Sequence, residues 1–173
     1  MKGGNELADT FGTEGSRAEL IEVTIKRYAN LIFRLAYTNL KNHHDAEDVL
    51  QDVSVALVRG NPPFDDEKHL KNWIVTATLN RCRDIYRSAW RNRTEPLEDY
   101  LALQAPETQS VMEELWQLPE NYRNIIYLYY YEGFTIPEIA EILGKSPNTI
   151  GSGLQRARKK LEKILTEEGK AYG

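Results

Sequence analysis

The chain has 173 residues, of which 41% are hydrophobic and 28% are charged, and its formal net charge is −4. This balance is typical of a soluble protein of one ordinary domain or two small ones, and it excludes a disordered or membrane-inserted chain. We expect a cytoplasmic protein, because the N-terminal residues lack the apolar stretch of a signal peptide and the single cysteine, Cys82, cannot form an internal disulfide.

The acidic net charge conceals two basic blocks. Residues 68–93 hold seven basic side chains and one acidic one, and residues 145–173 hold seven basic and three acidic ones. Residues 94–144, by contrast, hold one basic and ten acidic side chains. Because phosphate attracts clustered lysine and arginine, this asymmetry predicts separate surfaces for separate partners, with nucleic acid facing the basic blocks.

The first half of the chain is predicted to hold three helices. Residues 1–17 are rich in glycine and weakly patterned, so we expect a mobile tail there. Apolar residues then recur every three or four positions in three segments, separated by a turn at residues 41–44 and by residues 60–63, whose prolines cannot continue a helix. Asp45 is the predicted N-cap of the second helix. The apolar positions are Ile21, Ile25, Tyr28, Ile32 and Leu35 in the first helix, Ala46, Val49, Leu50, Val53 and Leu57 in the second, and Leu70, Ile74, Ala77 and Ile85 in the third, which covers residues 67–91.

An acidic linker and a second helical unit are predicted to follow. Residues 94–110 contain two prolines and show no sustained periodicity, which indicates a linker. A second unit covers residues 111–168. Its first apolar positions are Val111, Leu115 and Leu118, before Pro119, and then Tyr122, Ile125, Ile126 and Tyr129. No strand-like alternation persists anywhere, so we expect an all-α fold of two small helical domains joined by the acidic linker.

Residues 135–161 predict two helices joined by a tight turn. Thr135 and Glu138 have the spacing of a capping box, Gly144 suits the left-handed residue that ends a helix, and Ser146 with Pro147 restarts one. The expected buried positions are Ile139, Ala140 and Leu143 on the first helix and Ile150, Leu154, Ala157 and Leu161 on the second. This is the geometry of a helix-turn-helix that reads DNA, and the alternative is an ordinary helical hairpin with a solvated basic face.

In their order and spacing, these motifs resemble the extracytoplasmic-function (ECF) sigma factors of the sigma-70 superfamily. The matching segments are residues 45–52, Trp73-Ile74 with Asn80 and Asp84, Leu118-Pro119, and residues 146–161 with Arg156-Ala157-Arg158. The resemblance covers residues 20 to 165 and implies an alternative sigma factor that binds core RNA polymerase and directs promoter recognition, DNA melting and transcription initiation. Residues 18–93 would form sigma region 2, which binds core polymerase and the minus-ten element, and residues 111–168 would form region 4, which binds the minus-thirty-five element. The family also implies an anti-sigma partner.

Three sets of candidate site residues follow. The resemblance assigns core polymerase binding to one face of the second helix, with Asp48, Gln51, Asp52 and Val55. It assigns minus-ten binding to the loop at residues 60–66, where the family captures a flipped base, and to the third helix; the residues are Asn61, Phe64, Trp73, Asn80, Arg83, Arg87 and Arg91. Arginines suit phosphate, and aromatic rings suit exposed bases. On the last helix, polar residues suit base edges and cations suit phosphate. The minus-thirty-five set is Ser146, Asn148, Thr149, Ser152, Gln155, Arg156, Arg158 and Lys159.

Gly151 and Gly153 depart from the family, which often has lysine and arginine there. We therefore expect weak DNA binding by the second domain alone, and stronger binding when cations are added at both positions. A helix-turn-helix regulator that works without polymerase is the alternative function. We expect no enzyme, cofactor, metal or small-molecule substrate, because the chain lacks a glycine-rich phosphate loop and a metal-ligand motif. His43-His44-Asp45 is the one suggestive group, and a solvated turn is the simpler interpretation.

Overall fold

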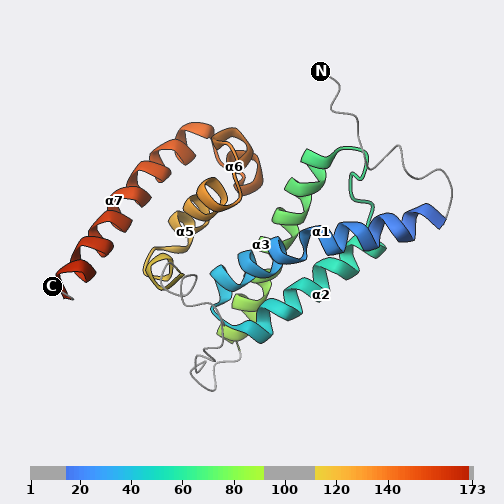
Figure 1. The fold of residues 1–173 in the computed structure, drawn as a ribbon, viewed down its shortest axis with the longest axis horizontal. Helices are drawn as coiled ribbons and strands as arrows, with labels where there is room; N and C mark the ends of the chain where they lie inside the picture. Colours follow the sequence, from blue (N-terminus) through green and yellow to red (C-terminus); the bar gives the residue numbers. More distant parts are fainter. Residues whose placement is uncertain (1–14, 92–111, 172–173) are drawn as a thin grey trace. The chain divides into compact units, whose positions relative to one another are not determined.

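The computed structural model describes residues 15–91 and 112–171, which form helices and turns with no strand among them (Figure 1). The all-α prediction is confirmed. The chain divides into two compact units, Met1–Glu98 and Asp99–Gly173. Residues 1–14 of the predicted tail and the whole predicted linker lie outside the described residues. Among the described helices, none combines the length and the apolar character that crossing a membrane requires.

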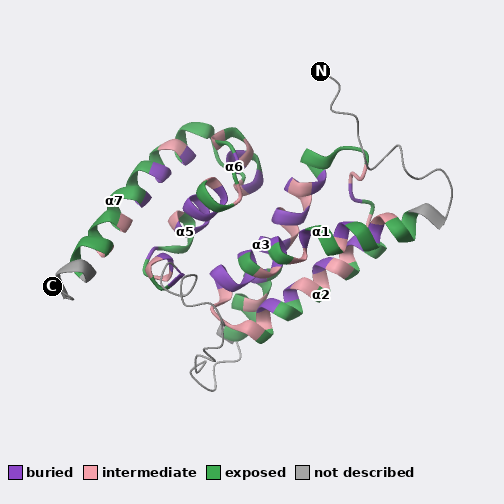
Figure 2. Cartoon of the chain, viewed as in Figure 1, coloured by how far each residue is buried: buried purple, intermediate pink, exposed green. Residues whose placement is uncertain are grey.

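The first unit contains three helices, α1 (Gly15–Leu40), α2 (His43–Arg59) and α3 (Glu67–Arg91), and each packs against the other two. Their apolar stripes turn toward one another, as the buried faces in Figure 2 show. The predicted positions that are buried are Ile21, Tyr28, Ile32, Leu35, Ala46, Val49, Val53, Leu57, Leu70 and Ile74. Ile25, Leu50, Ala77 and Ile85 are only half-buried, because they lie at the edges of these stripes.

The N-cap of α2 is Asn42 rather than Asp45. The Asn42 side-chain oxygen accepts a hydrogen bond from the Asp45 backbone N–H at 2.9 Å, and Asn42 itself has the extended backbone of a cap. Lys41 has a φ of 56°, so the chain leaves α1 through a left-handed residue. The helix therefore begins at His43, and Asp45 lies in its first turn, where unpaired N–H groups favour a carboxylate.

The second unit contains a short helical segment at residues 112–116, then α5 (Glu120–Ile126), a π-helical turn η1 (Tyr127–Tyr131), α6 (Ile136–Leu143) and α7 (Pro147–Ala171). Arg123 is only 7% exposed and joins the first two helical segments. Its side chain donates to the carbonyl oxygens of Leu115 at 3.2 Å and Leu118 at 2.9 Å. These carbonyls lie at and just beyond the C-terminal end of the short helix, where the helix dipole favours a cation.

The predicted caps of the helix-turn-helix are confirmed. Glu138 N–H donates to Thr135 Oγ1 at 3.4 Å, and Thr135 N–H donates to Glu138 Oε2 at 2.7 Å. Gly144 has a φ of 63° and ends α6. Ser146 Oγ accepts from the Thr149 N–H at 3.1 Å and caps α7.

The buried face of this element differs from the prediction at Ile142, Leu143 and Leu161. Ile142 is buried whereas Leu143 is half-buried, since Leu143 is the last residue of α6 and lies at the edge of its apolar face. Leu161 is also half-buried, because it borders an open groove along α7. Ile139, Ala140, Ile150, Leu154 and Ala157 are buried as predicted.

Candidate nucleic-acid interface

The outer face of α2 combines acidic and apolar side chains. Asp48, Gln51 and Val55 are exposed there, spaced by three and four residues, so they lie on one side of the helix. Val58 continues this face one turn further and is 54% exposed, more than Val55 at 45%. Val58 was missed by the sequence analysis, although its spacing of three from Val55 places it on the same side. This set of four residues, with the half-buried Asp52, is called the α2 outer face below.

Two polar contacts fix α3 against its neighbours. Arg81 Nε donates to Asp52 Oδ2 at 2.5 Å, which joins α3 to α2. The Tyr86 hydroxyl donates to the Asn39 carbonyl at 2.5 Å, which joins α3 to the end of α1. Asp52, which the resemblance assigns to polymerase binding, therefore already pairs with Arg81 within the chain. No local signal in the sequence indicates either contact, because the partners lie far apart along the chain.

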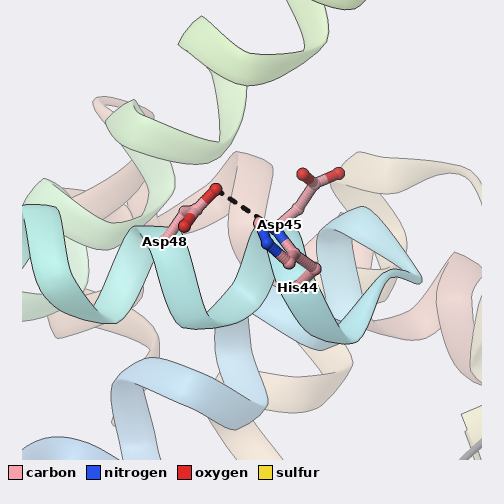
Figure 3. Close-up of side chains that lie close together, drawn as sticks. All are labelled: His44, Asp45 and Asp48. Carbon is pink, nitrogen blue, oxygen red and sulfur yellow. Dashed lines mark ion pairs between the residues drawn. The ribbon is translucent and has the colours of Figure 1, made fainter.

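His44, Asp45 and Asp48 bring three possible metal ligands within 4.8 Å of one another at the start of α2 (Figure 3). His44 Nδ1 lies 3.4 Å from Asp48 Oδ2, whereas Figure 3 shows the Asp45 carboxylate pointing away from this pair. Partial burial and the nearby Asp48 carboxylate raise the pKa of Asp45 above its usual value. The His44–Asp48 contact is the ordinary pairing of residues four apart on a helix, and we assign no metal to it.

The loop at residues 60–66 is tied down at both ends. At its start, the Arg17 side chain donates from Nη2 to the Gly60 carbonyl at 2.8 Å. The sequence had placed Arg17 in the N-terminal tail, but α1 begins at Gly15 and includes it. At its end, Asp66 Oδ1 accepts from the His69 N–H at 3.1 Å and caps α3. That hydrogen bond holds the pKa of the Asp66 carboxyl below its ordinary value. Between these ends, Asn61 is exposed.

A basic strip follows the solvent side of α3. Asn80, Arg83 and Arg87 are exposed and spaced by three and four residues, and Arg83 Nη1 donates to Asn80 Oδ1 at 3.1 Å. Trp73 lies two helical turns before Asn80 on the same side and is half-buried. Its ring carbon Cζ2 lies 3.8 Å from where a Cβ on residue 60 would stand, so the loop adjoins α3 at Trp73. Arg91 ends the helix, and its side chain lies outside the described residues.

The outer face of α7 presents amides and cations. Its exposed residues are Asn148, Thr149, Ser152, Gln155, Arg156 and Lys159. The hydroxyls of Ser146 and Thr149 lie 2.8 Å apart and are hydrogen-bonded to each other. Amide groups such as those of Asn148 and Gln155 can hydrogen-bond base edges, and cations such as Arg156 and Lys159 can pair with phosphate.

Arg158 lies at the flank of α7 rather than at the centre of this face. Its Nε donates to the Tyr130 hydroxyl at 2.5 Å, and its guanidinium lies 5.8 Å from the Tyr129 ring centre and 5.5 Å from that of Tyr130. Beside it runs an open groove of about 390 Å³, lined largely by apolar atoms. The lining residues are Ile126, Tyr130, Arg158, Leu161, Glu162, Leu165 and Thr166. Arg158 thus joins α7 to η1.

The two glycines of α7 occupy different environments, which corrects the expectation that both could carry a cation. A Cβ on Gly151 would meet nothing within 4 Å. Gly153 is buried, and a Cβ there would lie 2.8 Å from Ile125 Cδ1 of α5. The sequence held the signal for this difference, because Gly153 lies three residues after Ile150 and four before Ala157, on the buried stripe.

Two protein-family models match the chain. The model of sigma-70 region 2 matches residues 24–92, and the model of sigma-70 region 4 matches residues 108–161. The chain is 29% identical over 145 residues to the ECF RNA polymerase sigma factor SigM of Mycobacterium tuberculosis, covering 81% of this chain and 74% of that protein. It is 27% identical over 176 residues to the ECF RNA polymerase sigma factor SigW of Bacillus subtilis, covering 90% and 92% of the two chains.

A solved structure has the same fold. It contains the sigma factor RpoE of Bartonella quintana in complex with the anti-sigma factor NepR, and the likeness has a TM-score of 0.67 at 23% identity over 84% of this chain and 96% of that one. The chain described here belongs to the sigma-70 family. Within that family it is an ECF sigma factor, an alternative sigma factor that directs transcription initiation.

Proposed function

We propose that the α2 outer face binds core RNA polymerase. Two exposed valines at neighbouring turns, with the Asp48 carboxylate on the same side, form a small apolar surface with an acidic edge. Such a surface fits a partner that offers apolar contacts and cations, since protein interfaces bury an apolar centre inside a polar rim. The Asp52–Arg81 ion pair supports the proposal, because it links this face to α3, the helix that carries the basic strip.

We propose that both units contact promoter DNA. In the first unit, the minus-ten element would contact the loop at residues 60–66, then Trp73 beside the loop, and then the strip on the same side of α3. The outer face of α7 takes the minus-thirty-five element. The observation that carries this proposal is the concentration of cations and amides on the outward faces of α3 and α7 in a chain whose net charge is −4. Such faces are typical of contact with phosphate and base edges.

We also propose an anti-sigma partner that covers the α2 outer face and so blocks polymerase binding. The support is indirect: RpoE of Bartonella quintana, which shares this fold, was solved with its anti-sigma factor. The protein would act in the cytoplasm, where core polymerase works, and would contribute binding rather than a catalytic reaction of its own.

Run-off transcription tests the function directly. Purified core polymerase is incubated with the chain and a library of genomic promoter fragments, and the transcripts are sequenced. Start sites that require both core and this chain, with a shared sequence ten and thirty-five positions upstream, are the expected result. No chain-dependent transcript would refute the proposal. If the chain bound DNA equally well in the absence and in the presence of core polymerase, the polymerase-independent regulator would be favoured instead.

A matched pair of valines tests the polymerase surface. Val55 on α2 and Val23 on α1 are 45% and 43% exposed, so a lysine at either position has similar effects on solubility and folding. We expect Val55→Lys to weaken core binding about tenfold, the effect of a central interface residue that costs about 1.4 kcal/mol. Val23→Lys should bind core as the wild type does. Equal binding by both variants would remove the α2 outer face from the interface.

A further inference from the structure

The loop at residues 60–66 is held in one conformation by steric and hydrogen-bond constraints. A Cβ on Gly60 would lie 2.6 Å from the Ala56 carbonyl oxygen, so only glycine fits this close approach. The Gly60 N–H donates to that same oxygen at 2.8 Å. Further on, the Phe64 N–H donates to the Pro62 carbonyl at 2.9 Å, and Pro62 is buried. The loop is therefore a shaped element rather than a loose connection.

One side chain outside the loop contacts two of its residues. Arg17, near the start of α1, donates to the Gly60 carbonyl at 2.8 Å. The same guanidinium lies 5.9 Å from the centre of the Phe64 ring, within the range of a cation–π interaction. The planar guanidinium makes both contacts at once, which a lysine ammonium cannot reproduce in the same geometry. Arg17 thus spans the first residue of the loop and its aromatic ring.

We infer that Arg17 is a positioning residue that sets the base selectivity of the loop, an inference that rests on the proposed contact between this loop and the minus-ten element. Pulling a base out of its stack costs free energy, so the receiving surface must already be arranged when the base arrives. Arg17 holds Phe64 against α1 and fixes the backbone just before Asn61. The exposed Asn61 amide then meets the base edge in a constant orientation. Without Arg17, Phe64 and Asn61 sample several orientations, and the discrimination between bases falls.

A direct phosphate contact by Arg17 would leave a different signature. Losing an electrostatic contact to phosphate weakens binding about equally for all sequences, and the loss becomes smaller as the salt concentration rises. A positioning role changes the ratio between the best and the worst base. Arg17→Lys separates the two roles, because lysine keeps the charge but cannot stack on Phe64 and bond Gly60 together.

The experiment uses holoenzyme assembled from core polymerase and the full chain. The probe is a pool of forked duplexes whose single-stranded minus-ten segment is randomised, and bound DNA is sequenced to give an enrichment ratio at each position. We expect both Arg17→Ala and Arg17→Lys to lower the best-to-worst ratio at one position about fivefold, while core binding stays unchanged. Lys26→Ala is the matched control, since Lys26 is a cation of α1 whose ion pair with Glu22 lies within the same helix. Its ratios should equal those of the wild type.

Two further measurements make the outcome decisive. Hydrogen exchange of peptides covering residues 57–70 in the free protein should be faster in Arg17→Ala than in Lys26→Ala. The double variant Arg17→Ala with Phe64→Ala should select bases no worse than Phe64→Ala alone, because Arg17 acts through that ring. Rescue of the ratio by Arg17→Lys, or an unchanged ratio in Arg17→Ala, would overturn the inference while leaving the proposed function intact. A wild-type holoenzyme that enriches no sequence would overturn both.

Discussion

Whether Gly153→Ala stabilises or destabilises the second unit should depend on the side chain at position 125. Alanine in place of a mid-helix glycine stabilises a helix by about 0.5–1 kcal/mol. At Gly153 the added Cβ meets Ile125 Cδ1 at 2.8 Å, and overpacking of this kind costs about 1–3 kcal/mol. Gly153→Ala should therefore destabilise the second unit by about 1 kcal/mol, since the overpacking outweighs the gain in helix propensity.

Ile125→Val removes the clashing atom and provides the test. This change alone should cost about 0.5–1.5 kcal/mol. In its presence, Gly153→Ala should stabilise α7 by about 0.5–1 kcal/mol, which gives a coupling energy of about 1.5–2 kcal/mol between two residues in contact. Gly151→Ala is the matched control, because its Cβ meets open space and should stabilise α7 equally in both backgrounds.

Hydrogen exchange of α7 amides in the full-length protein measures these free energies for the second unit by itself. A coupling of about 1.4 kcal/mol corresponds to a tenfold change in protection. If Gly153→Ala had the same effect beside isoleucine and beside valine, the packing described between α5 and α7 would be refuted. The same contact predicts that Gly151→Lys strengthens promoter binding by holoenzyme, whereas Gly153→Lys does not.

Three further predictions concern stability. Arg81→Ala and Asp52→Asn should show a coupling of about 0.5 kcal/mol in urea unfolding that shrinks in 1 M salt, because the pair is partly solvated; a coupling above about 2 kcal/mol would contradict this view of the pair. Gly144→Ala should destabilise the helix-turn-helix by about 1–2 kcal/mol, since its φ of 63° disfavours a Cβ, and Gly144→Asn should cost less in the same assay. Because the pKa of Asp66 is lowered in the folded state, its contribution to stability is complete above the ordinary pKa of 3.8 and is lost as the pH falls through the folded-state pKa. The free energy of unfolding should therefore change less between pH 5 and pH 2 in Asp66→Asn than in the wild type. Parallel curves for the two proteins would refute the cap.

The features that the sequence predicted correctly are local ones. The capping box of Thr135 and Glu138 and the cap at Ser146 each join a side chain to backbone within three residues, and Gly144 ends α6 through its own left-handed backbone. Such contacts depend on spacing alone, and spacing is visible in the sequence. The N-cap of α2 shows the limit, because Asn42 and Asp45 are both good capping residues and the sequence pattern does not decide between them.

The features that could not be predicted from the sequence are contacts between elements that lie far apart along the chain. Arg17 lies 43 residues from Gly60, and Arg158 lies 28 residues from Tyr130. Charge and helical spacing place Arg158 on the outer face of α7, and no local pattern indicates the hydrogen bond from its Nε to the Tyr130 hydroxyl. Gly153 is different, since the helical period alone places it among buried residues. The prediction that Gly153 could carry a cation followed the family resemblance instead of the helical period, and it was wrong because Gly153 is buried.

The π-helical turn at residues 127–131 should tolerate exchanges between aromatic residues but not a change in the number of residues. Within residues 127–131 the Glu132 N–H donates to the Tyr127 carbonyl five residues back, at 3.3 Å, so this turn holds one residue more than an α-helical turn does. Removing one residue here would restore ordinary helix, but it would turn everything downstream by about 100° and shift it by about 1.5 Å along the axis. Tyr130 would then leave Arg158, and α6 would start from a different side of α5. Exchanges of one tyrosine for another aromatic residue should thus be tolerated, whereas insertions and deletions in this segment should be selected against.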